Sequence, residues 1–173
     1  MRTTKTKILV GVFLLAAVLL ITGIAWAKAT KSPIMGTLTV QISGPPEKYW
    51  EDDEGWGHYR SVPSVYVFTS GDLEGTGSSM VNVNFDLLTM DGDESGSAVI
   101  NVTWGELSGT LEGRLSGTYT AGISTGTAVY HGVSGDFEGM KLMMSYTTDF
   151  TTGPPGTPWP VTYQAIVLDP QSE

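Results

Sequence analysis

Histidine and cysteine are the first residue types to consider for chemistry, because their side chains can transfer protons, attack substrates or bind metals. The chain has 173 residues with two histidines, His58 and His131, and no cysteine. The two histidines are far apart in the sequence, and neither stands in an HExxH or G-x-S-x-G pattern. The sequence therefore predicts no zinc enzyme, no hydrolytic triad and no thiol chemistry, and we assign no catalytic residue.

An acidic segment is similar to the first half of a calcium-binding loop. Asp91, Asp93 and Ser95 follow the spacing D-x-D-x-S-G. The glutamate that such a loop needs at its twelfth position is missing, since Val102 stands there within a predicted strand. We interpret the segment 91–96 as a polar hairpin turn, with a low-affinity calcium site as the alternative. No other cofactor is expected.

A second candidate site is the loop 43–61, which places aromatic rings around the acidic run 51–54. Three interpretations stay open: a lid that closes over a bound molecule, a contact surface for another subunit or a sugar, and a plug that fills one end of the fold while the carboxylates face water. With one tryptophan from outside the loop, the candidate ligand-binding residues are Tyr49, Trp50, Trp56, His58, Tyr59 and Trp104.

Strands must position these residues, because apolar and polar side chains alternate along most of the chain after residue 35. Alternation over 37–42, 81–87 and 98–104 is typical of half-buried strands, and Ala98, Ile100, Val102 and Trp104 share one face. Further strands are expected near 64–69, 109–120, 124–131, 137–148 and 161–168. About eight strands at such close spacing predict an all-β antiparallel meander.

A short motif, S-G-x-[LF]-E-G, occurs at 70–75, 108–113 and 134–139. Its first glycine permits a positive φ, its Leu or Phe points inward, and its second glycine lets a sheet bend. The apolar parity changes after Phe137, which predicts a bulge at Gly139. Because closing a small barrel requires strands that coil, we predict a single up-and-down antiparallel β-barrel over 36–170. A β-sandwich is the alternative architecture.

The segment 71–150 resembles the allene oxide cyclase-like barrels, a family that includes the dirigent proteins and bacterial relatives. The resemblance is carried by GDLEG at 71–75, GTLEG at 109–113 and GDFEG at 135–139, the last being similar to the family's G-x-G-x-F-x-G-x-x-G element. Val133 and Leu142 stand where that element has its first and last glycine. The resemblance implies a barrel whose apolar interior holds a lipophilic molecule. In the characterised members a carboxylate, polar side chains and bound water steer cyclisation or radical coupling, and none of those positions is matched here.

The N-terminus has the pattern of an export signal. Three basic residues precede an uncharged apolar run over 8–27, which ends in the small-x-small triplet A-W-A. These features predict a signal peptide over 1–27 with cleavage after Ala27. Because about 20 apolar residues can span a bilayer, an uncleaved signal-anchor helix is the alternative. Residues 28–35 would then be a linker, and the barrel would lie outside the cytoplasm, secreted or anchored to the outer face of the cytoplasmic membrane.

Charge limits the partners of this domain. Without residues 1–27, six basic and eighteen acidic residues leave a net charge of −12. Such a surface repels nucleic acid, so a nucleic-acid partner is not expected. Membrane contact is expected only through residues 8–27, if they are retained.

Three functions are compatible with these features. The first is a non-enzymatic barrel that binds a small apolar molecule outside the cytoplasm. The second is a structural or interaction module, tethered to a membrane or self-associating as a homo-oligomer. The third is a cyclase or isomerase of the resembled family, which requires a buried carboxylate or histidine beside a cavity.

Overall fold

The computed structural model describes residues 30–154 and 156–170, and the predicted signal or anchor helix lies outside these residues. Within them, nine strands and one short 3-10 helix follow one another. They are β1 (Thr30–Ile42), β2 (Lys48–Glu51), β3 (Trp56–Gly71), β4 (Glu74–Asp86), β5 (Gly92–Trp104), β6 (Leu107–Thr120), β7 (Ile123–Gly135), β8 (Lys141–Asp149), η1 (Phe150–Thr152) and β9 (Trp159–Asp169). No helix in the described part of the chain is long and apolar enough to cross a membrane.

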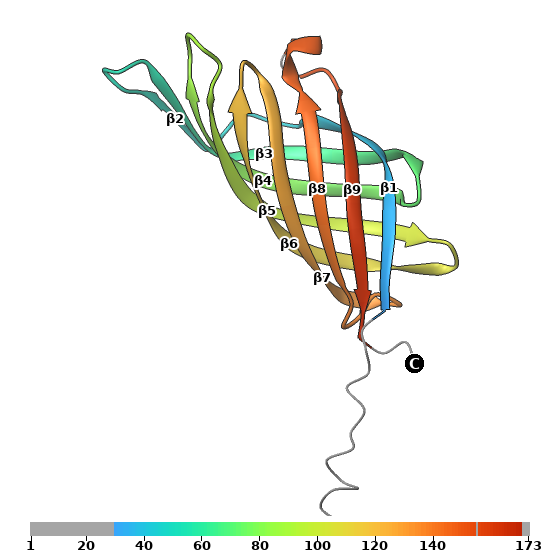
Figure 1. Ribbon diagram of the computed structural model, residues 1–173. Coiled ribbons are helices and arrows are strands. Elements are labelled where there is room, and N and C mark those ends of the chain that lie inside the picture. The colour runs from blue at the N-terminus through green and yellow to red at the C-terminus, as the bar shows by residue number, and fades with distance from the viewer. Residues whose placement is uncertain (1–29, 155, 171–173) are drawn as a thin grey trace, which may run out of the picture. The chain divides into compact units, whose positions relative to one another are not determined.

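The strands form an antiparallel meander that closes on itself (Figure 1). From β3 to β9 each strand pairs with the next, β9 pairs with β1, and the pairing of β1 with β3 completes the ring. Eight strands form the barrel, while the short β2 adds a hairpin to the start of β3. The all-β antiparallel barrel predicted from the sequence is confirmed, and the sandwich alternative is wrong.

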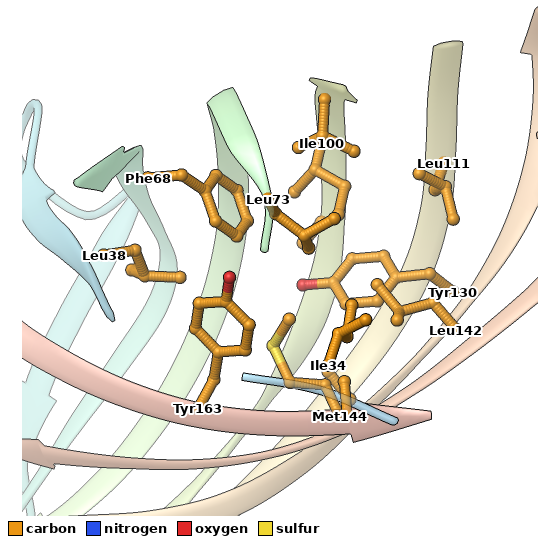
Figure 2. Close-up of a cluster of buried hydrophobic side chains, with 14 of the residues drawn as sticks. Ile34, Leu38, Phe68, Leu73, Ile100, Leu111, Tyr130, Leu142, Met144 and Tyr163 are labelled. Carbon is orange, nitrogen blue, oxygen red and sulfur yellow. The ribbon is translucent and has the colours of Figure 1, made fainter. Parts of the chain in front are cut away.

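The barrel interior is filled by side chains that alternate with outward-facing ones along each strand. In β9 the alternation is strict, since Trp159, Val161, Tyr163, Ala165 and Val167 are buried and the residues between them are exposed. Large buried side chains from around the wall meet in one cluster (Figure 2), which includes Leu38, Phe68, Leu73, Ile100, Leu111, Tyr130, Leu142 and Met144. Burial of each such side chain contributes about 1.5–3 kcal/mol, so the core can stabilise the fold without disulfides.

The first copy of the repeated motif forms a corner between β3 and β4. Gly71 has a φ of 106°, a value that favours glycine, and the turn places Leu73 in the core with 2% exposure. Asp72 fixes the corner to β1: its amide donates to the Met35 carbonyl at 3.0 Å, and its carboxylate accepts from the Met35 amide at 2.7 Å.

The third copy forms a matching corner after β7. Gly135 has a φ of 70°, and Phe137 is buried. The Asp136 amide donates to the Ser108 carbonyl at 2.8 Å, and its carboxylate accepts from the Ser108 amide at 2.9 Å. The middle copy, at 108–113, lies within β6, where Gly109 pairs with Gly135. The first and third copies of the motif therefore form two equivalent corners. The middle copy lies in β6, the strand to which the corner of the third copy is hydrogen-bonded.

Two predicted boundaries are wrong. β1 begins at Thr30, so residues 30–35, predicted as part of a linker, pair with β9. The parity change after Phe137 comes from a turn between β7 and β8, and β8 begins at Lys141, so there is no bulge at Gly139 within a continuous strand 137–148.

The predicted turn at 91–96 is also wrong, because the chain turns earlier. The Asp86 carboxylate accepts hydrogen bonds from the amides of Leu88 and Thr89, at 2.8 and 3.0 Å, and this Asx turn reverses the chain. β5 then begins at Gly92 and includes most of the acidic segment. The side chain at position 94 consequently points into the barrel, where it is buried.

Candidate functional site

The most unusual feature of the barrel interior is a buried glutamate. Glu94 on β5 is 9% exposed and accepts hydrogen bonds from three hydroxyl groups. Tyr119 of β6 donates to Oε2 at 2.6 Å, whereas Ser124 of β7 and Tyr146 of β8 both donate to Oε1 at 2.7 Å. We refer to these four residues as the Glu94 cluster. A buried carboxylate is costly unless it is hydrogen-bonded, so the three donors are needed to hold it there.

Strand register brings the Glu94 cluster together. Glu94, Gly117, Gly126 and Tyr146 stand opposite one another on β5, β6, β7 and β8. The two glycines leave open the space through which Glu94 and Tyr146 meet. A Cβ at Gly117 would lie 2.9 Å from both Glu94 Oε1 and Tyr146 Oη, and a Cβ at Gly126 would clash with the Tyr146 hydroxyl.

The tyrosine hydroxyls of the interior stay protonated and can therefore donate. Burial, followed by the nearby Glu94 carboxylate, raises the pKa of Tyr119 and of Tyr146 far above the ordinary value. Burial also raises the pKa of Tyr66 to about 12, and its hydroxyl donates to Ser79 Oγ at 2.6 Å. The site thus presents neutral donors gathered around one acceptor group.

A cavity of about 70 Å³ lies beside Glu94 within the barrel. Its walls are mainly aliphatic and aromatic, and Glu94 is the one residue among them with an ionisable carboxyl group. The lining residues are Leu38, Val40, Tyr66, Phe68, Glu94, Ile100, Leu115, Ala128, Tyr130, Met144, Tyr146, Thr148, Phe150 and Val161. The cavity is large enough for a small chemical group, because an ordered water occupies about 30 Å³ of liquid volume.

Aromatic rings form a continuous row at the end of the barrel that holds the Glu94 cluster. Phe85 contacts Tyr119, Tyr119 contacts Phe150, and Phe150 contacts Trp159, with ring centroids 5.7, 5.6 and 5.0 Å apart. Trp159, at the end of the row, is buried. This row packs at that end of the barrel, whereas in loop 43–61 Trp50 is 44% exposed and Trp56 is half-buried.

The predicted ligand-binding residues lie mostly on the β2–β3 hairpin. Register places Tyr49 opposite Tyr59 and Trp50 opposite His58, and the rings of each pair are in contact. Trp56 begins β3 beside them, whereas Trp104 ends β5, far along the barrel from the hairpin. None of the six lines the cavity beside Glu94.

The hairpin has its own polar cluster, which we call the Asp52 cluster and which consists of Asp52, His58, Arg60, Asn84 and Asp93. The His58 ring contacts Asp52 Oδ2 through Nε2 and Asn84 Oδ1 through Nδ1, both at 2.9 Å. Arg60 donates to the same Asn84 oxygen at 2.9 Å, and the Asn84 amide nitrogen donates to Asp93. Because Arg60 only donates and Asp93 only accepts, the orientation of Asn84 is fixed, and both His58 nitrogens face acceptors. These contacts with Asn84 and then Asp52 raise the pKa of His58.

The calcium candidates do not converge on one point in the structure. Asp93 and Ser95 are exposed on the outer face of β5, and Asp93 accepts from Asn84. Asp91 lies before the strand, where its carboxylate accepts from the Ala121 amide at 2.9 Å. Within residues 30–154 and 156–170, no group of three or more histidine, aspartate or glutamate side chains is placed to hold a metal ion.

Sequence reasoning missed all four members of the Glu94 cluster. One signal was available: the inward face of β5 includes Ala98, Ile100 and Val102, and extending this even parity backwards reaches residue 94. The interpretation of the acidic segment as a turn conflicts with this, because a turn has no alternation of inward and outward side chains.

No family model matches the chain, and no curated protein shows significant similarity to it.

Proposed function

We propose that this protein is a non-enzymatic binding barrel that holds a small, largely apolar molecule in the cavity beside Glu94. The observation that carries the proposal is an apolar-walled cavity with one polar group, inside a closed barrel whose remaining interior is well packed. Binding sites for small molecules commonly combine apolar walls with a few placed polar groups. The apolar part of the guest would contact Leu38, Ile100 and Met144, and its polar end would face the Glu94 cluster.

The size of the cavity limits the guest. About 70 Å³ is below the ~300–1,000 Å³ of pockets that enclose a drug-sized molecule. We therefore expect a small or slender molecule whose head group lies beside Glu94.

Native mass spectrometry of the full-length gene product, purified from its membrane or secreted fraction, tests the proposal. We expect a constant extra mass that is lost on denaturation. The Ala128→Leu variant fills the cavity from β7 and should lose that mass, because Ala128 is buried in the lining. The neighbouring Thr127→Leu variant adds the same side chain on the exposed outer face and should keep it. A bare wild-type protein that also binds no added apolar ligand would overturn the proposal.

The same measurement tests the location of the protein. We propose that it acts outside the cytoplasm, and the basic residues that precede the apolar run over 8–27 support this. A mass that begins at Lys28 in the secreted fraction would indicate cleavage after Ala27. A mass that includes residues 1–27, found in membranes, would indicate a signal-anchor. Protein in the cytoplasmic fraction with an intact N-terminus would contradict the proposal.

A cyclase or isomerase of the allene oxide cyclase-like type is a second candidate, favoured by one observation. Glu94 supplies a buried carboxylate beside a cavity, with hydroxyl donors in contact with it. Such a group can polarise or deprotonate a bound substrate. The two candidates differ in the fate of the guest: extracted ligand that returns chemically unchanged after prolonged incubation supports binding, and conversion that is abolished in Glu94→Gln supports catalysis.

A further inference from the structure

Glu94 is a buried acid without a basic partner. Its contacts are hydroxyl groups, which are neutral donors. No lysine, arginine or histidine of the described chain lies within ion-pair distance of it. The lysines and arginines of this part of the chain are Lys31, Lys48, Arg60, Arg114 and Lys141, and none of them lines the cavity. Buried carboxylates in proteins are ordinarily paired with a cation or bound to a metal, so the missing partner needs an explanation.

The cavity walls next to Glu94 are rich in aromatic rings. Five of the lining residues are aromatic: Tyr66, Phe68, Tyr130, Tyr146 and Phe150. Aromatic faces attract cations, and the attraction increases when the cation is shielded from water. Because phenylalanine and tyrosine faces supply this attraction without a formal charge, the walls would stabilise a positive group without repelling its apolar substituents.

The Glu94 oxygens have room for another donor. Oε1 accepts from Ser124 and Tyr146, whereas Oε2 accepts from Tyr119 alone among the hydrogen bonds of the described residues. A carboxylate offers about four acceptor positions and the three hydroxyls use three of them, so one position is left for a further donor.

We infer that the guest of this barrel is a lipophilic amine, whose protonated nitrogen binds Glu94 among the aromatic rings while its apolar chain lies along the cavity wall. The ammonium supplies the positive charge that the interior lacks. The volume of about 70 Å³ beside Glu94 suits an ammonium head group and its first carbons. This inference rests on the proposed function and narrows its ligand class to organic cations.

Isothermal titration calorimetry with two ligands of equal chain length tests the inference. We use hexylammonium and 1-hexanol with the full-length protein, because both can hydrogen-bond Glu94 and only one is charged. Wild-type protein should bind hexylammonium at least about 10-fold more tightly than 1-hexanol, a difference of about 1.4 kcal/mol. Glu94→Gln should lose this preference and bind both ligands to within about 3-fold of each other. Glu106→Gln removes the same charge from an exposed turn and should keep the preference.

Glu94→Asp keeps the charge but withdraws it by one methylene, so it provides a second test if the glutamine variant does not fold. It should still prefer hexylammonium, with a several-fold loss of affinity. Equal affinity of the wild type for both ligands, or a preference for 1-hexanol, would overturn the cation assignment and leave the binding barrel intact. Hexylammonium affinity unchanged in Glu94→Asp would also overturn it. If neither ligand binds wild-type protein that native mass spectrometry shows to be bare, this inference and the proposed function both fail.

Discussion

The two carboxylate clusters of this barrel, around Glu94 in the interior and around Asp52 on the β2–β3 hairpin, are built from different partners. Glu94 accepts from three neutral hydroxyl groups. Asp52 contacts His58, which can carry a positive charge, and its carboxylate also accepts hydrogen bonds from two backbone amides. The exterior acid therefore has a basic partner within the chain, whereas the interior acid has none among the described residues.

The two clusters also differ in what they do for the fold. Asp52 folds its own loop, because its carboxylate accepts from the amides of Glu54 and Trp56 and orients His58. Those contacts explain the hairpin as a structural element. The Glu94 cluster instead links four strands, β5 to β8, across the barrel interior, and two inward glycines, Gly117 and Gly126, are required to make room for it. A buried acid that the fold must make room for, and whose hydroxyl partners carry no charge, is a candidate for function.

The largest effect on stability is expected for removal of the interior acid. Glu94→Ala deprives Tyr119, Ser124 and Tyr146 of their acceptor and enlarges the cavity, so we expect the free energy of unfolding to fall by about 3 kcal/mol. Urea denaturation measures this value. Glu106→Ala, at an exposed turn, is the control and should change it by less than about 0.5 kcal/mol. A Glu94→Ala protein as stable as the wild type would show that the three hydrogen bonds contribute nothing net.

A smaller effect is expected for a single donor to Glu94. Tyr146→Phe keeps the ring and removes one hydrogen bond to the carboxylate, so the free energy of unfolding should fall by about 1.5 kcal/mol. In a double-mutant cycle with Glu94→Ala, the Tyr146→Phe change should cost much less, because its partner is already gone. Additive losses would mean that the Tyr146 hydroxyl stabilises the barrel through some other contact.

The barrel was predictable and the interior cluster was not, and the reason lies in how each is encoded. Alternation over 98–104 indicates a strand, and the repeated motif indicates corners, each from residues close together in the sequence. Ile100, Leu73 and Phe137 could therefore be placed inward. Glu94 meets Tyr146 only because Gly117 and Gly126 stand between them across two strands, and that depends on register. Register was set by an Asx turn at Asp86, several residues before the segment that the sequence marked as the turn.

A pH-dependent effect is expected at the Asp52 cluster. Hydrogen bonds to Asn84 and Asp52 raise the pKa of His58, so its stabilising contribution is complete below the ordinary value of 6.5 and is lost as the pH rises through the raised pKa. The pKa of Asp52 is lowered, chiefly by the hydrogen bond from His58, so its contribution is present above 3.8 and is lost as the pH falls through the lowered value. The hairpin should be most stable between these limits.

NMR titration of the His58 ring measures this effect. The midpoint should lie above 6.5 in the wild type and should move down in Asp52→Asn, which retains the shape of the side chain and removes its charge. Asp93→Asn, one step further along the hydrogen-bond chain, should move it less. A midpoint at or below 6.5 in the wild type would mean that the contacts of His58 with Asp52 and Asn84 are not maintained in solution.

The smallest effect on the interior site is expected for Trp50→Ala. Trp50 contacts His58 and Arg60 on the hairpin and does not line the cavity, so affinity for hexylammonium should stay within about 2-fold of the wild type. The loss of the exposed cation–π contact should lower the free energy of unfolding by less than about 1 kcal/mol. Ala128→Leu, by contrast, should abolish measurable binding. If Trp50→Ala weakens binding as much as Ala128→Leu does, the aromatic hairpin is part of the ligand site. A hairpin that covers the guest as a lid would explain that loss, whereas a purely structural hairpin would not.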